Sequence, residues 1–341
     1  MDFPIPSGAP RGDGSESSPY NWWPDFEGAS EDDPIDVLIA GHSAGALPAS
    51  GLPPFVRIYG GYHRGERFMR RFPLVLVDLS SVKIGEADPA LPPSARVIDG
   101  FRVRSSHSRP QIDVEGGPLL LSRNVFGQGG TANSVEIVSI DSSTNVALIG
   151  NVFDSSGVTV IGQDAPFVRL KNGAAPSLLF NDFYRDELAE VSELDPSSAI
   201  LLDGEASGIF VGNRVWTGGA PSRVSFFKGG SLEAFGPSMI YGNAIVPGAT
   251  VWSDGQSGVG WFAVEARAHG QPSGAAPNLT TVECGAWLPL GICRTGTGDG
   301  GKQLKELDGK VGLHLRNWLD LDWQGKRRPE NEASIGASQV P

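Results

Sequence analysis

The chain has 341 residues, which is enough for one large domain or two ordinary ones. It contains 46 glycines and 26 prolines, and 40% of its residues are hydrophobic while only 19% are charged, which excludes a disordered chain and a helical protein and predicts many short strands joined by turns. The net charge of −12 argues against nucleic acid as a partner and against a strongly polyanionic substrate, because nucleic-acid binders usually display a basic face.

Residues 1–34 are rich in Gly, Pro and Ser, and we expect them to form an N-terminal arm or cap. Their first part has neither a basic stretch nor an apolar one, so no signal peptide is predicted in this chain. No apolar run approaches the roughly 20 residues that a membrane span needs. We therefore expect no membrane span, and either secretion after removal of a signal or release with a virion.

Residues 35–45, IDVLIAGHSAG, contain the pattern G-x-S-x-G around Ser43. In α/β-hydrolases this pattern forms a nucleophile elbow, a strained turn between a strand and a helix. Pro48, Pro53 and Pro54 follow closely and prevent a long helix. We expect a turn of a β-protein here, and a serine hydrolase that uses Ser43 stays a remote alternative.

An asparagine repeat organises the middle of the chain. Five short apolar segments each end in Asn, one variable residue and an apolar residue, and the asparagines are spaced by 27, 30, 32 and 30 residues. They are Asn124, Asn151, Asn181, Asn213 and Asn243. A strand pattern precedes each of the last four segments, at residues 135–141, 167–171, 199–203 and 224–228. A unit therefore reads strand, polar turn, strand, Asn turn and variable loop.

About 30 residues per turn, with short β-branched runs and tight corners, fit a right-handed parallel β-helix and no helical solenoid. The segments 55–62, 74–80 and 95–106 continue the pattern upstream, and 260–270 reads as a late coil. We expect an N-terminal arm or cap at 1–34, one all-β solenoid at 35–270 and an irregular C-terminal cap at 271–341.

The repeated asparagine has a physical reason. Coils of a parallel β-helix stack about 4.8 Å apart, so an inward Asn can bond the same residue in the coils above and below. Asn also tolerates a left-handed backbone, which suits a corner. The five asparagines are therefore predicted to form a structural ladder.

Charged residues at the ends of the second strands are the candidate binding site. Asp141, Lys171, Asp203 and Lys228 occupy similar places and alternate in sign, so stacked coils would bring them together. One interpretation is a solvated row of ion pairs, worth little per pair. The other is a polar groove that contacts a glycan, to which the ring of Trp216 would add a stacking surface. No catalytic residue, metal ligand or cofactor site is identified.

Other tryptophans and the cysteines give weaker signals. Trp252 and Trp261 are placed in loops, where exposed rings could stack on sugars, whereas four others are expected to cap the solenoid ends. These are Trp22, Trp23, Trp318 and Trp323. Cys284 and Cys293 could close a small disulfide loop or stay as thiols, and they lack the ligands of a zinc site. Asn278 begins the glycosylation sequon NLT.

Four blocks of the chain carry a family resemblance. The chain resembles the secreted right-handed parallel β-helix repeat proteins that end in a choice-of-anchor Q segment. The blocks are SGAPRGDGSESSP (7–19), PIDVLIAGHSAG with LPPFVRIYGGYHRGERFMRRF (34–45 and 52–72), VIDGFRV (97–103) and DWQGKRRPENEASIGASQ (322–339). Ser334 and Gln339 depart from the terminal pattern, where the family has Asp and Glu. The resemblance implies the fold and an extracellular setting, and no single reaction.

The sequence thus predicts a non-catalytic, extracellular, cell-surface or virion-exposed β-helix protein, structural or adhesive, that presents loops to a glycan or a protein partner. A homo-oligomer is expected to be accessible to such a solenoid, and by analogy a tailspike-like trimer if it belongs to a virion. The alternative is a polysaccharide lyase or glycosidase on the same fold, with catalytic residues assembled from different coils.

Overall fold

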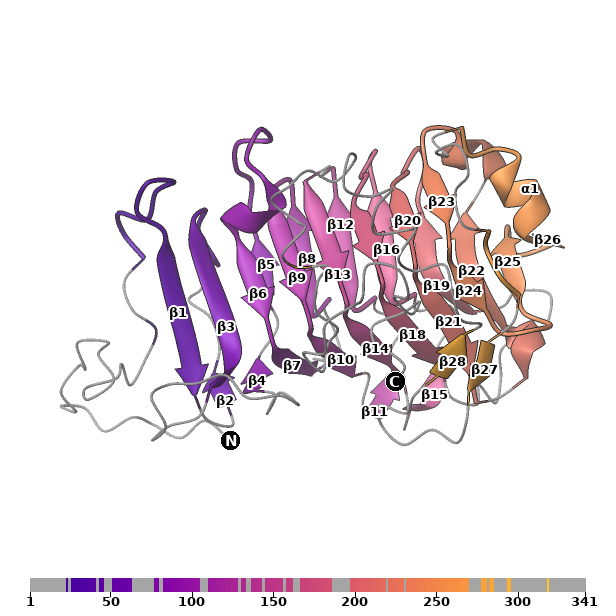
Figure 1. Cartoon of the computed structure of the whole chain (residues 1–341), viewed down its shortest axis with the longest axis horizontal. Helices are drawn as coiled ribbons and strands as arrows, with labels where there is room; N and C mark the ends of the chain where they lie inside the picture. Colours follow the sequence, from indigo (N-terminus) through magenta and orange to yellow (C-terminus); the bar gives the residue numbers. More distant parts are fainter. Residues whose placement is uncertain are drawn as a thin grey trace.

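The chain is nearly all β, with parallel strands stacked into a solenoid (Figure 1). This computed structural model describes residues 23, 26–40, 43–45, 51–62, 77–79, 82–104, 110–127, 130–132, 136–142, 145–155, 158–161, 166–185, 197–218, 220–229, 231–269, 277–280, 282–284, 293–295 and 318. The expected all-β parallel solenoid is confirmed.

Three long sheets run along the solenoid axis in the described residues. Sheet A contains β1 (Ile35–Ala40), β3 (Val56–Tyr62), β6 (Val97–Asp99), β9 (Leu119–Ser122), β13 (Val146–Ile149), β17 (Ser177–Leu179), β20 (Ile209–Val211) and β23 (Met239–Tyr241). Sheet B contains β2 (Ser43–Gly45), β4 (Val77–Leu79), β7 (Phe101–Arg104), β10 (Val125–Gly127), β14 (Val152–Asp154), β18 (Asp182–Arg185), β21 (Arg214–Thr217) and β24 (Ala244–Ile245). Sheet C contains β5 (Val82–Ile84), β8 (Ile112–Glu115), β12 (Val138–Asp141), β16 (Val168–Lys171), β19 (Ser197–Leu202), β22 (Val224–Gly229), β25 (Thr250–Ser253) and β26 (Gly258–Val259).

The remaining elements are short. Strand β11 (Gly130–Ala132) pairs with β15 (Val158–Ile161), and β27 (Val282–Cys284) pairs with β28 (Cys293–Thr295). Helix α1 spans Trp261–Glu265, and 3-10 turns span Pro93–Ala95, Pro221–Arg223 and Leu232–Phe235. The segment 260–270 is therefore no further coil, because α1 interrupts it; its run WFAVE lacks the alternation of a strand.

Each coil holds three strands rather than the two that the sequence predicts. The extra strand, in sheet B, follows the asparagine corner and spans only two to four residues in β10, β14, β18, β21 and β24. Such a short strand shows no periodicity of its own in the sequence. Its partners in the neighbouring coils reveal it, for example Phe126, Phe153 and Phe183 in register.

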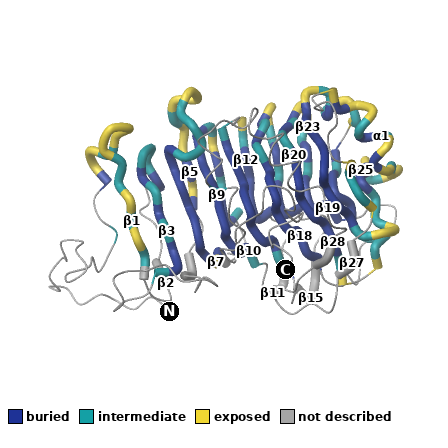
Figure 2. Tube along the Cα trace, viewed as in Figure 1, coloured by how far each residue is buried: buried dark blue, intermediate teal, exposed yellow. Residues whose placement is uncertain are grey.

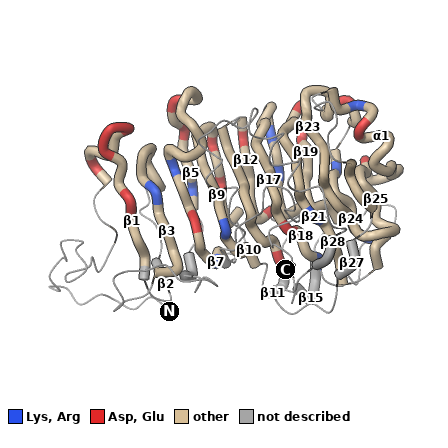
Figure 3. The backbone as a smooth tube through the Cα atoms, viewed as in Figure 1, with Lys and Arg blue, Asp and Glu red and all other residues tan. Residues whose placement is uncertain are grey.

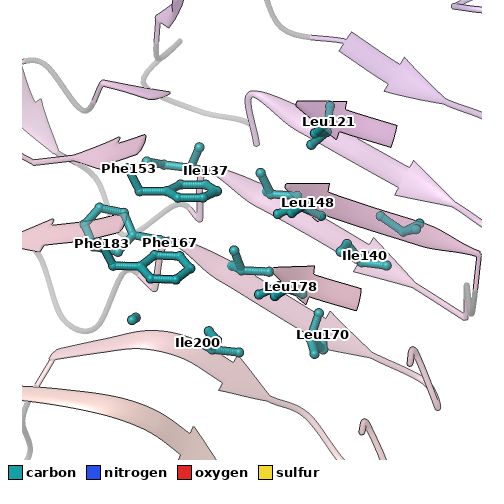
Figure 4. Packing of buried hydrophobic residues seen from close by; sticks show 14 of the residues in the cluster. Leu121, Ile137, Ile140, Leu148, Phe153, Phe167, Leu170, Leu178, Phe183 and Ile200 are labelled. Atoms are coloured by element: carbon teal, nitrogen blue, oxygen red, sulfur yellow. The ribbon is translucent and has the colours of Figure 1, made fainter. Parts of the chain in front are cut away.

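Rows of identical inward side chains build the core (Figure 4). In sheet B the rings of Phe126, Phe153 and Phe183 stack with centroids 4.8 Å apart at each step. In sheet A an aliphatic row that includes Leu121 and Leu148 faces them. Stacking equal side chains at strand spacing lets neighbouring coils pack closely, because each coil repeats the shape of the last. Figure 2 shows the buried middle of the solenoid, with exposed residues at its loops and ends.

The corner between sheets A and B has a left-handed residue immediately before each asparagine. Arg123, Gly150, Phe180, Gly212 and Gly242 all have φ between 51° and 66°. The asparagines themselves are not among the residues with positive φ. The corner thus selects Asn for its side-chain bonds, and the left-handed backbone falls one position earlier, where three of the five residues are Gly. The expectation that Asn itself adopts the left-handed backbone is wrong.

Candidate functional site

The outer face of sheet A is largely apolar and covered from β6 onward. From β6 to β23 most apolar side chains that strand alternation turns away from the core are no more than 7% exposed, whereas Asp36, Leu38 and Arg57 at the β1–β3 end are accessible. The buried set, with the corner residue Phe180, is Val97, Leu120, Ala147, Ile149, Leu179, Phe180, Val211, Met239 and Tyr241. Trp318 packs against the same cluster, with its ring parallel to that of Tyr59 at 6.2 Å. This buried apolar set offers no accessible hydrogen-bonding group to a polar ligand.

Trp318 therefore covers a side of the solenoid instead of an end. The guanidinium carbon of Arg123 lies 5.6 Å from the centre of the Trp318 ring. Asp99, fully buried, accepts two hydrogen bonds from Arg123, at 2.9 and 2.6 Å. Burial raises the pKa of Tyr59 to about 12, and the charge of Asp36 adds to this. Trp23, by contrast, packs on the core beside Phe26.

The outer face of sheet B is also largely closed from β10 to β24, although Arg102 on β7 is exposed. Arg214 is 1% exposed and donates two hydrogen bonds to Asp182, at 2.7 and 2.6 Å. Trp216 is 4% exposed and packs against Tyr184 and Ala244. A buried ring offers no surface to a sugar, so Trp216 is not a glycan contact in this structure. Trp252 and Trp261 belong to the core as well.

Among the described residues, the outer face of sheet C stays accessible over consecutive coils from β5 to β22. We call its polar residues the charged face: Lys83, Asp113, Glu115, Glu136, Ser139, Asp141, Arg169, Lys171, Asp203 and Lys228. Figure 3 shows charged positions that recur from coil to coil along the solenoid. Four of the five residues predicted to contact a glycan are on this face.

Ion pairs between coils connect the charged face. Lys171 donates to Glu136 at 3.2 Å and to Ser139 at 2.9 Å. Arg169 donates to Asp203 at 2.6 Å, and its guanidinium lies 4.0 Å from Glu136. Glu136 is buried, whereas Arg169 and Lys171, which pair with it, are partly exposed. The network therefore has a buried carboxylate and cations that reach the solvent.

The register corrects the predicted alternating row. Asp141 and Lys171 are register partners, but Lys228 aligns with Leu201, two positions before Asp203. Asp141 accepts hydrogen bonds from Ser142 and Asn172 instead of pairing with Lys171. These two bonds lower the pKa of Asp141. The charges thus form a two-dimensional network and not one alternating ladder.

Among the described carboxyl groups of this face, Asp113 is the one whose pKa is raised. It aligns with Lys83 on one side and Ser139 on the other. Burial raises the pKa of Asp113, and the charges of Glu115 and Glu136 also raise it, while Lys171 and Lys83 act in the opposite direction. Lys83 itself is bonded to Glu115 at 2.9 Å. The sequence signal for Asp113 is the alternation in IDVE, which puts two carboxylates on one face.

The asparagine ladder lies between sheets A and B and has a structural role. Each side-chain amide donates to the Asn oxygen of the next coil at 2.9–3.1 Å and to a backbone carbonyl of the previous coil at 2.7–2.9 Å. Asn278 supplies a sixth rung that the sequence pattern misses. Its amide donates to Ile240 and Glu265, at 2.9 and 2.7 Å. Both protons are therefore engaged, and this sequon is a cap of the ladder and no glycan acceptor in the folded chain.

Ser43 is placed differently from the hydrolase alternative, and other predictions concern residues outside the described ones. Ser43 begins strand β2, which pairs with β4, so it is not on the strand-to-helix turn of a hydrolase. Trp22, Trp323 and the segment 322–339 lie outside the described residues. Within the described residues, no group of three or more His, Cys, Asp or Glu could hold a metal ion, and no helix has the length and apolarity to traverse a bilayer.

Comparison with protein-family models, with curated proteins and with solved structures gives no match for this chain. The fold therefore stands on the structure, and function has to be argued from the charged face.

Proposed function

We propose that the protein is a non-catalytic, extracellular or virion-exposed adhesive β-helix that binds a glycan through the charged face. The observation that carries the proposal is the contrast between the sheets: in the middle of the solenoid the outer faces of sheets A and B are mostly buried, whereas sheet C presents an accessible ion-pair network. Paired carboxylates and cations at a rigid surface can donate to and accept from sugar hydroxyls, and charge strengthens such bonds.

The charges of this face favour a neutral glycan over a polyanion. Lys83, Arg169 and Lys171 each have a carboxylate partner on the same face. A polyanion would have to displace these partners and would meet a chain of net charge −12. A neutral sugar can bond to paired groups without separating them.

A binding screen on a broad polysaccharide panel tests the proposal. The variant Asp203→Ala with Lys228→Ala removes charges from the face, and we expect it to weaken binding at least tenfold, because bonds to charged groups are worth about 1.5–3 kcal/mol each. Arg57→Ala is the matched control, since its pair with Asp36 is exposed but belongs to sheet A. Binding that both proteins lose equally, or no binding to any member of the panel, would contradict the proposal.

A second candidate is a glycosidase or polysaccharide lyase on the same face. The raised pKa of Asp113, beside Glu136 and Lys171, is what favours it, because glycosidases need one carboxyl that keeps its proton near the working pH. New reducing ends, or absorbance of unsaturated uronates, would reveal cleavage of the same panel. Cleavage that Asp113→Asn abolishes and Asp141→Asn retains would replace the adhesive function by an enzymatic one.

A further inference from the structure

A small hairpin after the ladder cap carries both cysteines of the chain. Strands β27 and β28 are antiparallel, and their register pairs Val282 with Thr295 and Glu283 with Arg294. The third pair in this register is Cys284 with Cys293. The two cysteines thus occupy directly opposed positions, which their spacing in the sequence did not require.

We propose that Cys284 and Cys293 form a disulfide that locks this hairpin. Directly opposed residues of antiparallel strands have Cα atoms about 4.5–5.5 Å apart. A disulfide requires a Cα separation of about 4.4–6.8 Å, so the register meets the backbone condition without any movement of the strands. The inference does not depend on glycan binding.

Formation of this bond needs an external oxidant, namely a disulfide reagent that reacts by thiol–disulfide exchange. The thiolate of one cysteine attacks that disulfide, forms a mixed disulfide and releases one thiol. The second cysteine then displaces the other half of the reagent and closes the bond within the chain. Two electrons pass to the reagent, which leaves as two thiols that carry the protons of Cys284 and Cys293.

The position of the hairpin connects the disulfide to the end of the solenoid. The segment 277–280 supplies the last ladder rung, and its Leu279 forms a parallel bridge to Ala244. The Leu279 carbonyl also accepts a hydrogen bond from the indole of Trp261 at 3.1 Å. Strand β27 begins at Val282, so the hairpin directly continues the segment that covers the end of sheet B.

Mass spectrometry of the full chain tests the bond. Protein held in a glutathione buffer of mixed redox state is denatured and alkylated with N-ethylmaleimide, with and without prior reduction. We expect no adduct before reduction, two adducts after it, and a linked peptide pair in a non-reduced digest. Two freely alkylated thiols, or cysteines joined between chains, would overturn the proposal.

A variant in which one cysteine is moved by one residue tests whether the strand register determines the disulfide. Cys293→Ser combined with Arg294→Cys moves the thiol by one residue, to the position opposite Glu283, and keeps the loop almost the same length. We expect its equilibrium constant for disulfide formation, measured against glutathione, to fall at least tenfold below that of the natural pair. Equal constants would show that the hairpin register does not determine the bond, and the proposal would fail.

Discussion

The outer faces of sheets A and C are built by the same coils and have opposite chemistry. Sheet A turns residues such as Leu120 and Leu179 outward and buries them, while sheet C turns Asp113, Arg169 and Lys171 outward and leaves them accessible. The inner rows have no such freedom, because coil must stack on coil. The difference teaches that each outer face of a solenoid can take its own role while the core stays unchanged.

Burial explains why the two faces cannot exchange roles. Apolar surface costs about 25 cal/mol for each Å² left in water, so the outer row of sheet A requires a cover. Trp318 provides part of that cover from the C-terminal part of the chain. The charged face needs no cover, because its ions pair with one another and remain hydrated. Sheet A behaves as a second core over its middle coils, and sheet C as an open charged surface.

The largest expected effect comes from breaking the buried ion pair at the edge of the covered face. Asp99→Ala leaves the Arg123 guanidinium, in a side chain only 10% exposed, without its bidentate carboxylate. We expect a loss of about 3–5 kcal/mol in the free energy of unfolding. Asp36→Ala is the control on the same sheet, because its pair with Arg57 is exposed and should cost less than about 1 kcal/mol.

Urea unfolding, followed by tryptophan fluorescence, measures both variants. Similar midpoints for Asp99→Ala and Asp36→Ala would mean that the covered face is open to water in solution. The contrast between sheets A and C would then disappear.

Two leucines provide the next test, one on each outer face. Leu179 is fully buried on sheet A, whereas Leu201 is partly exposed on sheet C between Arg169 and Lys228. Leu179→Gln should cost roughly 3 kcal/mol, because it removes apolar packing and buries an amide. Leu201→Gln should change stability by less than about 0.5 kcal/mol. Equal costs in the same urea experiment would show that outward leucines are equivalent on the two faces.

Sequence patterns predict what repeats and miss what depends on register. Asn124 and Asn151 recur at coil spacing, so their ladder could be predicted, and alternation located the strands that carry Asp141 and Lys171. Asn278 escaped because it lies outside any repeat, 35 residues beyond Asn243. The pairing of Glu136 with Lys171 joins different coils, and only the strand register brings those residues together.

Tryptophan positions show the same limit. An aromatic side chain in an apparent loop can stack on a sugar or fill the core, and Trp216 fills a small core of its own. The cover on sheet A could not be predicted either, because Trp318 is distant in sequence from Tyr59 and Arg123, and no periodicity connects them. Contacts of this kind follow from tertiary packing and leave no local signal.

Removing the cover should have an intermediate effect. Trp318→Ala should cost about 2 kcal/mol, less than a fully buried aromatic, and should increase the binding of an apolar dye. It should also lower the pKa of Tyr59 from about 12 toward its ordinary value of 10, because burial is the main cause of that shift. Stability by urea unfolding and tyrosinate absorbance during an alkaline titration measure the two effects.

Phe262→Ala is the matched control for Trp318→Ala, because the ring of Phe262 is 87% exposed. It should leave both stability and the Tyr59 titration unchanged. A Tyr59 pKa that does not respond to Trp318→Ala would refute the cover.

The smallest expected effect lies on the charged face and has the opposite sign. Burial raises the pKa of Asp113 above its ordinary value of 3.8, so the folded state binds the proton more tightly than the unfolded state does. Between these two pKa values stability falls as the pH rises, and above both the ionised carboxylate is a constant penalty. Asp113→Asn should therefore stabilise the protein at pH 7, by less than about 0.5 kcal/mol because the group is part-exposed.

Urea unfolding at a series of pH values distinguishes Asp113→Asn from its control, Asp141→Asn. The gain from Asp113→Asn should vanish as the pH falls below 3.8. Two hydrogen bonds lower the pKa of Asp141, so Asp141→Asn should destabilise at neutral pH, and that loss should also vanish in acid. A variant at Asp113 that is more stable yet binds or cleaves glycan less well would show that this carboxyl is kept at a cost in stability for its function. A gain in stability with unchanged glycan binding and cleavage would instead assign that function to other residues of the face.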